Sequence, residues 1–224
     1  MIAPSQKKSG LRIQLIKAAS EIISKEGLKK LTMRALADRV GVSRTASYRH
    51  FANKDALLFA IAEEGFRELT IRYRKINRNK SLDSISRLQN IGLVYIEFAI
   101  LNPGSFRLMF GQEITQHQRS EKLYSNASEA FNELLIAVKA FQDEQNMAKG
   151  EHSILANISW ATVHGLATLL LDGQIQVLGA NYGLPTLLTE DRPKIRENVQ
   201  SMLDFSEQFL RCFWDNILDG ILHE

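Results

Sequence analysis

The sequence TMRALADRVGVSRTASYRHFANK, residues 32–54, decides the fold, because it predicts two short helices around a tight turn with a third helix directly after them. Thr32 can cap a helix over residues 33–40, whose apolar side chains share one face. Gly41 can end that helix, since glycine adopts a left-handed backbone conformation at little cost. Ser43 can cap the next helix, which has room for only about two turns. This pattern is typical of a helix-turn-helix.

The second helix of this motif has a cationic outward surface. At about 100° per residue, four side chains share one arc of it: Arg44, Thr45, Tyr48 and Arg49. Two guanidinium groups, a hydroxyl and a phenol can contact base edges and phosphates in a major groove. The alternative is a plain helical hairpin whose charges are only solvated. DNA binding is favoured because the small Ala37, a turn glycine four residues later and this arc occur together.

The charge distribution supports this interpretation independently. Residues 1–60 contain twelve Lys or Arg and four Asp or Glu, a net charge of +8, so the remaining 164 residues carry −5 of the total of +3. Positive potential is therefore concentrated in the N-terminal part, as expected where that part binds a polyanion. A helical adaptor that binds another protein is a further alternative, and it would leave this basic segment unexplained.

Residues 11–58 resemble the DNA-binding domain of the TetR family of transcriptional regulators, most densely in LTMRALADRVGVSRTASYRHFANKDALL. The Tyr-x-His-Phe sequence at residues 48–51, followed by Asn53 and Lys54, is much more specific than a generic helix-turn-helix. Ser47 departs from the pattern, because family members often have a large apolar residue there, and we expect looser packing beneath the recognition helix. The resemblance implies these DNA-binding residues: Arg34, Ser43, Arg44, Thr45, Tyr48, Arg49, His50 and Lys54.

Composition fits a soluble globular protein and favours no enzyme class. With 45% hydrophobic and 24% charged residues, 224 residues can bury a core as one large or two small domains. The single Cys212 cannot form an intrachain disulfide, and the N-terminus has no apolar leader, which together favour a cytoplasmic protein. The longest apolar stretch, residues 166–171, is too short to span a bilayer.

No motif for catalysis or metal binding is recognisable in the sequence. It contains no phosphate-binding glycine loop, no paired cysteines and no nucleophile elbow, so we expect no catalytic residue, no metal and no cofactor. The remaining alternative in this class is an enzyme in which His117, His152 and His164 assemble in space with scattered carboxylates.

Almost every segment has helical periodicity, which predicts an all-α fold. The expected domains are a three-helix helix-turn-helix DNA-binding domain, residues 1–55, and a larger helical effector-binding and dimerisation domain, residues 77–224. A helix from residue 54 to about 76 should connect them, with Asn53 as its cap. The segment 172–193 could be a lid, a dimer arm or a loop. Further helices are expected over residues 11–27, 82–100, 106–110, 120–143, 151–171 and 193–221.

The last two helices have apolar stripes that could pack on two partners at once. The TetR resemblance implies a homodimer built from these helices, which would place two recognition helices in successive major grooves. The same side chains could instead face only their own core. Small residues in the penultimate helix would permit close helix approach: Ala156, Ser159, Ala161 and Gly165. The expected dimer-interface residues are Met202, Phe209, Phe213 and Ile217.

Trp160, His164 and Gly165 have a spacing similar to the tryptophan-histidine-glycine pattern of one TetR C-terminal subgroup. The resemblance implies a repressor released from a palindromic operator by a small apolar ligand held between the C-terminal helices. The expected partners are double-stranded operator DNA, this effector and a second copy of the chain, with no membrane. Plain core packing is the alternative for each candidate cavity residue. These candidates are Tyr95, Phe98, Phe106, Met109, Phe110, Phe131, Trp160 and His164.

Overall fold

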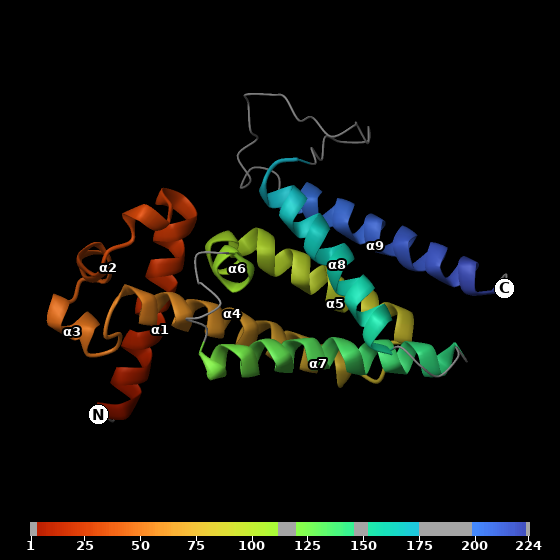
Figure 1. The fold of residues 1–224 in the computed structure, drawn as a ribbon, viewed down its shortest axis with the longest axis horizontal. Coiled ribbons are helices and arrows are strands. Elements are labelled where there is room, and N and C mark those ends of the chain that lie inside the picture. The colour runs from red at the N-terminus through yellow and green to blue at the C-terminus, as the bar shows by residue number, and fades with distance from the viewer. Residues whose placement is uncertain (1–3, 112–119, 146–151, 175–198, 223–224) are drawn as a thin grey trace. The chain divides into compact units, whose positions relative to one another are not determined.

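The computed structural model describes residues 4–111, 120–145, 152–174 and 199–222, apart from the side chains of residues 4–9, 199, 201–202 and 217–222. Within these ranges the chain forms helices and no strand, which confirms the all-α prediction (Figure 1). A 3-10 turn at Leu28–Lys30 follows the first helix. The helices are α1 (Pro4–Glu26), α2 (Met33–Val40), α3 (Arg44–Tyr48), α4 (Lys54–Asn77), α5 (Ser84–Leu101), α6 (Pro103–Phe110), α7 (Glu121–Glu144), α8 (His152–Leu171) and α9 (Val199–Leu222).

The chain divides into two compact units. The first consists of Met1–Glu68 and Asn102–Ser128, and the second of Leu69–Leu101 and Glu129–Glu224. The first unit therefore contains α1, α2, α3 and α6, and the second contains α5, α8 and α9. Two helices, α4 and α7, belong partly to each unit, so the chain passes between the units within continuous helices as well as at the end of α5.

The first unit is built on packing of α1 against α2, and α3 packs on α2 in turn. Leu15, Ala19 and Ile22 of α1 recur at helical spacing and are at most 1% exposed. Leu36 and Ala37, which share one face of α2, are fully buried as well. The short helix α3 has only five residues and little apolar surface of its own, so its position depends on this platform.

Helix α6 packs on α1 within the first unit. The backbone N–H of Gly104 donates to Oγ of Ser24 at 3.0 Å, and the hydroxyl oxygens of Ser20 and Ser105 are 3.0 Å apart. Pro103 occupies the first turn of α6, where a missing N–H costs no helical hydrogen bond. The start of α6 is therefore fixed to the first helix of the helix-turn-helix unit.

In the second unit α5 packs on both α8 and α9 (Figure 1). Ile96 and Ala99 of α5 are fully buried. Gly92 allows the close approach of both neighbours, because a Cβ on it would lie 3.1 Å from the two methyl groups of Leu210 and 3.2 Å from Cγ1 of Val163. Any larger residue at this position would require α8 or α9 to move away from α5.

A buried carboxylate joins α7 to the end of α4 in the second unit. Glu133 is 7% exposed, and its two carboxylate oxygens accept hydrogen bonds from Nε of Arg74 at 2.7 Å and from Nδ2 of Asn77 at 2.9 Å. Arg74 also donates to Glu129 at 3.1 Å. These bonds offset the cost of removing a carboxylate from water. They join α7 to the last turns of α4, where the sequence is mostly polar.

The observed helices agree closely with those expected from periodicity. Asn53 caps α4 as predicted, since its Oδ1 accepts the N–H of Ala56 at 2.8 Å. Helix α1 begins at Pro4 and not near residue 11, because polar residues can extend a helix without adding to its apolar stripe. The expected start of the last helix at residue 193 lies outside the described residues, as does most of the segment 172–193.

Helix α8 is long and apolar enough, by length and composition alone, to cross a membrane, and it is the one described helix of which this is true. The expectation from residues 166–171 considered only an uninterrupted apolar run, whereas the whole 20-residue helix has few charged groups to interrupt it. Core helices of globular proteins also meet this criterion. Because α8 packs on α5, its buried face belongs to the core of the second unit.

Candidate DNA-binding site and effector cavity

Two hydroxyl caps and a left-handed glycine fix the helix-turn-helix. The side chains of Thr32 and Ser43 each accept a hydrogen bond from the backbone N–H three residues later, at 3.0 and 3.2 Å. Gly41 has φ 73°, and the following N–H, that of Val42, donates to the carbonyl of Ala37 at 3.0 Å. Side chains with a Cβ rarely adopt this conformation, which explains the glycine at the turn. All three local predictions are confirmed.

Helix α3 exposes the arc that its helical spacing predicts. The side chains of Arg44, Thr45, Tyr48 and Arg49 are all exposed, and Tyr48 keeps 52% of its surface in contact with solvent. Within the described part of the chain, neither Arg44 nor Arg49 has an ion-pair partner, so both guanidinium groups are available to an anion. A phosphate backbone and the acceptor atoms of guanine are suitable partners for such groups.

Phe51 anchors the chain just after α3. It is 3% exposed, and the guanidinium carbon of Arg12 lies 5.3 Å from the centre of its ring, which is a cation–π contact between α1 and the recognition segment. The ring of half-buried His50 is 6.5 Å from that of Phe51. Arg12 was not predicted from the sequence, because Arg12 and Phe51 are far apart along the chain and no sequence pattern indicates their contact.

Ser47 is the inward-facing residue of α3. It is fully buried, and its hydroxyl has no hydrogen-bond partner among the described residues. An unsatisfied buried hydroxyl costs about 1–3 kcal/mol relative to a satisfied one. Beneath the recognition helix there is therefore a buried polar group at the position where the sequence departs from the family pattern, and the looser packing expected there stays a prediction.

Three further predicted DNA-binding residues lie at the edge of the motif. Nζ of half-buried Lys54 donates to the carbonyl of Leu28 at 3.0 Å and keeps two further N–H donors. Arg34 is exposed, with Nε 3.8 Å from a carboxylate oxygen of Asp38, a weak surface pair. Ser43 acts as a helix cap with its side chain exposed. The roles of all eight residues in DNA contact stay predictions.

The residues predicted for an effector cavity separate into two groups. Phe106, Met109 and Phe110 belong to the first unit, where the ring centres of Phe106 and Phe110 are 5.1 Å apart and that of Phe66 lies 5.3 Å from Phe110. Phe98 belongs to the second unit and is 1% exposed, as a core residue would be. The second unit also contains the remaining four: Tyr95, Phe131, Trp160 and His164.

A hydrogen-bonded cluster forms among the predicted residues of the second unit. The hydroxyl of Tyr95 is 2.7 Å from Nδ1 of His164, and Trp160 also hydrogen-bonds to Tyr95. The ring of Trp160 is 5.8 Å from that of His164 and 6.2 Å from that of Phe131. Burial raises the pKa of Tyr95 and lowers the pKa of His164, so both groups are neutral near pH 7.

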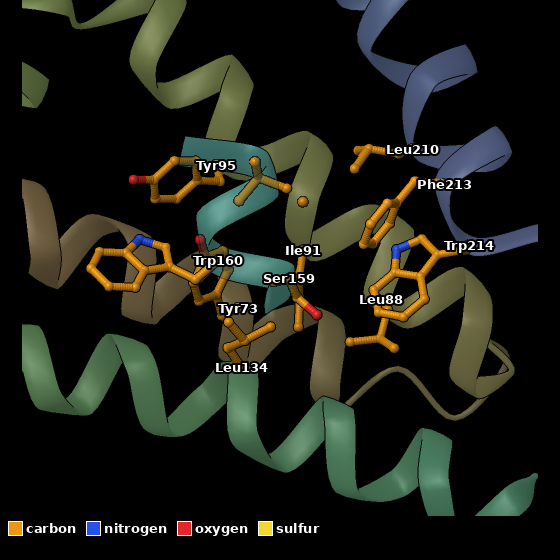
Figure 2. A pocket seen from close by; sticks show the side chains of 12 residues that line it. Tyr73, Leu88, Ile91, Tyr95, Leu134, Ser159, Trp160, Leu210, Phe213 and Trp214 are labelled. Carbon is orange, nitrogen blue, oxygen red and sulfur yellow. The ribbon is translucent and has the colours of Figure 1, made fainter. Parts of the chain in front are cut away.

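A cavity of about 20 Å³ lies in the second unit between side chains of α4, α5, α7, α8 and α9 (Figure 2). Figure 2 shows Tyr95 and Trp160 on one side of it and Leu210, Phe213 and Trp214 of α9 on the other. Its volume is enough for about one water molecule. Every described residue that lines it is uncharged. Two of the predicted ligand-binding residues thus line a common cavity.

Other residues of this cavity were not predicted as ligand-binding. Tyr73 lies in a polar run of α4, where its burial was not evident from neighbouring residues. Leu88 was assigned to no site, since one leucine in a helical stripe suggests only core packing. Trp214 is 2% exposed, and its position four residues after Leu210 on the same helical face could have revealed its inward orientation.

The predicted dimer residues lie on α9. Phe213 is half-buried and lines the cavity, and its ring centre is 5.1 Å from that of Trp214. Phe209 is also half-buried, and its ring centre is 6.4 Å from that of Phe205. The side chains of Met202 and Ile217 lie outside the described residues. The part that these residues play in an interface stays a prediction.

The small residues of α8 lie on two different faces. Ala156 and Ser159 are buried within their own chain, where α8 packs on α5, so their small side chains suit close helix approach inside the second unit. Ala161 is exposed, and a Cβ on Gly165 would have no atom within 4 Å. The difference arises because helical spacing identifies a face without identifying what covers it.

A basic helix-turn-helix followed by a larger helical unit is the arrangement expected of a DNA-binding regulator. Residues 15–61 match the family described as bacterial regulatory proteins, tetR family, and residues 88–182 match the tetracyclin repressor-like C-terminal domain. The chain belongs to the TetR family of regulators. The two matched regions include the helix-turn-helix and the helices that line most of the cavity.

Similar proteins of known sequence are nucleoid occlusion factors. The nucleoid occlusion factor SlmA of Alteromonas mediterranea is 30% identical over 162 residues, which cover 69% of this chain and 80% of that protein. SlmA of Vibrio cholerae is 28% identical over 148 residues, which cover 65% and 73% of the two chains.

Solved structures have the same fold. A protein of unknown function from Rhodococcus sp. RHA1 is 25% identical with a TM-score of 0.65, over 88% of this chain and 94% of the other. The regulator FadR of Bacillus subtilis in complex with stearoyl-CoA is 14% identical with a TM-score of 0.62, over 87% and 96%. The family whose model matches the chain is one of bacterial regulatory proteins.

Proposed function

We propose that this chain is a homodimeric repressor that binds a palindromic operator through α3 and leaves it when a small effector binds the second unit. The observation that carries the DNA-binding part is the exposed arc of α3, with two guanidinium groups available to an anion. Four residues are assigned to base edges: Arg34, Arg44, Thr45 and Arg49. Three are assigned to phosphates: Tyr48, His50 and Lys54.

A second copy of the chain would meet the outer face of α8. Ile154, Ile158 and Leu169 are each close to half exposed, and together with Ala161 and Gly165 they recur every three to four residues along one side of the helix. So much exposed apolar surface on one face is typical of an association site. Two TetR-type heads must be paired to occupy successive major grooves, which requires such an interface.

The cavity and the recognition motif share one helix. Tyr73, which lines the cavity, and Lys54, which is assigned to a phosphate, both belong to α4. An effector that displaced side chains around Tyr73 could therefore alter the placement of the DNA-binding head through α4. A coupling of ~1–3 kcal/mol would change operator affinity about 5- to 150-fold, provided that the effector prefers the form that does not bind DNA.

Nucleoid occlusion is the second candidate function, favoured by the names of the relatives near 30% identity. Chromatin immunoprecipitation from cells that express the chain distinguishes the two functions. A repressor should occupy a few sites upstream of genes whose transcripts rise when the chain is deleted. A nucleoid occlusion factor should occupy many sites spread over the chromosome with little effect on neighbouring transcripts.

Selection of bound sequences from random DNA duplexes tests the proposed DNA-binding function. We expect an inverted repeat whose half-sites lie about one helical turn apart, roughly 34–36 Å. Lys54→Ala should then weaken binding to every sequence alike and reduce the salt dependence by roughly one phosphate contact. Recovery of sequences without a common motif would contradict sequence-specific recognition.

A further inference from the structure

We propose that the effector of this chain is an uncharged molecule with an apolar body and one hydrogen-bonding group, and that Tyr95 is the residue that selects this group. The inference rests on the proposed effector site in the second unit and specifies the chemistry of its ligand. It follows from three properties of the described residues: the charge of the cavity walls, the polar cluster beside them and the room available.

The cavity walls offer no counter-ion. The polar atoms among the described lining residues belong to tyrosine, tryptophan and serine, and the hydroxyl of Ser159 already donates to the carbonyl of Leu155 at 2.6 Å. The charged groups of α4 nearest in sequence to Tyr73 are engaged in ion pairs, Arg72 with Glu97 and Arg74 with Glu133. A carboxylate, phosphate or ammonium in this cavity would lose its hydration without gaining a partner of opposite charge.

The polar cluster beside the cavity gives the site two different ends. Tyr95 and Trp160 contribute to the cavity wall (Figure 2). The Tyr95 hydroxyl lies 2.7 Å from Nδ1 of His164, whose side chain is not drawn in that figure. Leu210 and Phe213 of α9 form an apolar wall opposite. A ligand with a hydroxyl or amide group can exchange that group into the Tyr95 cluster while its apolar body displaces α9 side chains. An entirely apolar ligand would gain nothing from the cluster.

The small volume determines how the ligand enters. About 20 Å³ holds one water molecule, so a ligand of several carbon atoms requires lining side chains to move. Phe213 and Trp160 are only half-buried, so they are the lining residues whose side chains have room to move. Displacing packed side chains costs free energy and weakens the binding of the ligand. Loss of one hydrogen bond at the polar end should therefore change the affinity by a measurable amount.

The two tryptophans of the chain give a direct measurement of occupancy. Trp160 and Trp214 are the only tryptophans in the sequence, and both line the cavity. Their fluorescence should change when 1-octanol binds, and the change should saturate. Octanoate is negatively charged and octylammonium is positively charged, and both have apolar chains of nearly the same length as that of octanol. Each should require at least about tenfold higher concentrations.

Tyr95→Phe tests the polar end, with Tyr124→Phe as its control. Tyr124 is exposed on α7 and takes no part in the cavity, so its variant also loses one phenol oxygen without affecting the site. Tyr95→Phe should weaken octanol binding about three- to tenfold, and Tyr124→Phe should leave it unchanged. Equal or tighter binding of octanoate, an unaltered octanol affinity in Tyr95→Phe, or no saturable change with octanol would overturn the proposal.

The same samples are tested for binding of a selected operator duplex, so that the two proposals fail separately. If operator binding is intact and octanol has no effect on tryptophan fluorescence, the assignment of the ligand class is wrong and the DNA-binding function stands. If octanol binds as expected and no duplex sequence is preferred, the ligand site stands and the proposed function is wrong.

Discussion

Gly104 lies so close to α1 that a Cβ on it would be 2.8 Å from the carbonyl oxygen of Ser20. Backbone atoms cannot move aside as a flexible side chain can, so α6 must shift if this residue is enlarged. The hydrogen bond from the N–H of Gly104 to Ser24 would be lost with that shift. The contact joins the start of α6 to the first helix of the DNA-binding unit.

Gly104→Ala should therefore destabilise the protein by about 1–3 kcal/mol, measured by urea unfolding. The control is Gly10→Ala, also in a helix, where a Cβ would have no atom within 4 Å. Alanine in that open helical position should stabilise by up to about 1 kcal/mol, because it restricts the unfolded chain. If Gly104→Ala were as stable as Gly10→Ala, the close packing of α6 on α1 would be wrong.

Ser47→Ala should increase stability by about 1 kcal/mol or more, because it removes a buried hydroxyl that has no partner among the described residues. Ser125→Ala, at an exposed position of α7, corrects for the better helix propensity of alanine. The gain at Ser47 should exceed the gain at Ser125 in chemical denaturation. A loss of stability at Ser47 would indicate that the hydroxyl has a partner, such as a bound water.

Ile158→Glu should convert a dimer into monomers in sedimentation experiments, and operator affinity should fall with it. A charge in the middle of an apolar interface loses hydration without compensation. Ile136→Glu is the matched control, because Ile136 of α7 is 47% exposed and Ile158 is 46% exposed. Ile136→Glu should remain dimeric. A monomeric wild-type protein at micromolar concentration would contradict the proposed interface.

Stability should fall as pH decreases below the ordinary histidine pKa, in part because of His164. Burial lowers the pKa of His164 in the folded protein, so below about pH 6.5 the unfolded chain binds this proton more readily than the folded chain does. The contribution of His164 is therefore complete above that pH and decreases below it. His164→Gln should flatten the dependence of Tm on pH between 7.5 and 5.5. An unchanged slope would contradict a protonation-sensitive His164.

Local chemistry made the helix-turn-helix predictable from sequence. Thr32, Gly41 and Ser43 act within a few residues of their own positions, so helix ends and the turn follow from cap geometry alone. The outward arc of α3 followed equally from helical periodicity. The contact between Arg12 and Phe51 could not be predicted, because it depends on how α1 and the end of α3 pack.

The candidate cavity was only partly predictable. Tyr95 and Trp160 were identified as available aromatic residues, but sequence could not separate them from Phe106 and Phe110, which belong to the other unit. Which aromatic residues share a cavity depends on tertiary packing. Trp214 was missed for the same reason, since a residue of the last helix could equally have faced a second copy.

The central claim is that α3 recognises DNA. The most direct test compares the operator affinity of the Arg44→Ala variant with that of the Arg78→Ala variant. Both substitutions remove one exposed guanidinium, but Arg78 lies in the second unit, outside the helix-turn-helix. Binding of each protein to the selected operator and to a scrambled duplex is measured at one salt concentration. Arg44→Ala should lose ~1–3 kcal/mol of its preference for the operator, whereas Arg78→Ala should keep the wild-type preference. An unchanged preference in Arg44→Ala would contradict the assignment of α3 as the recognition helix.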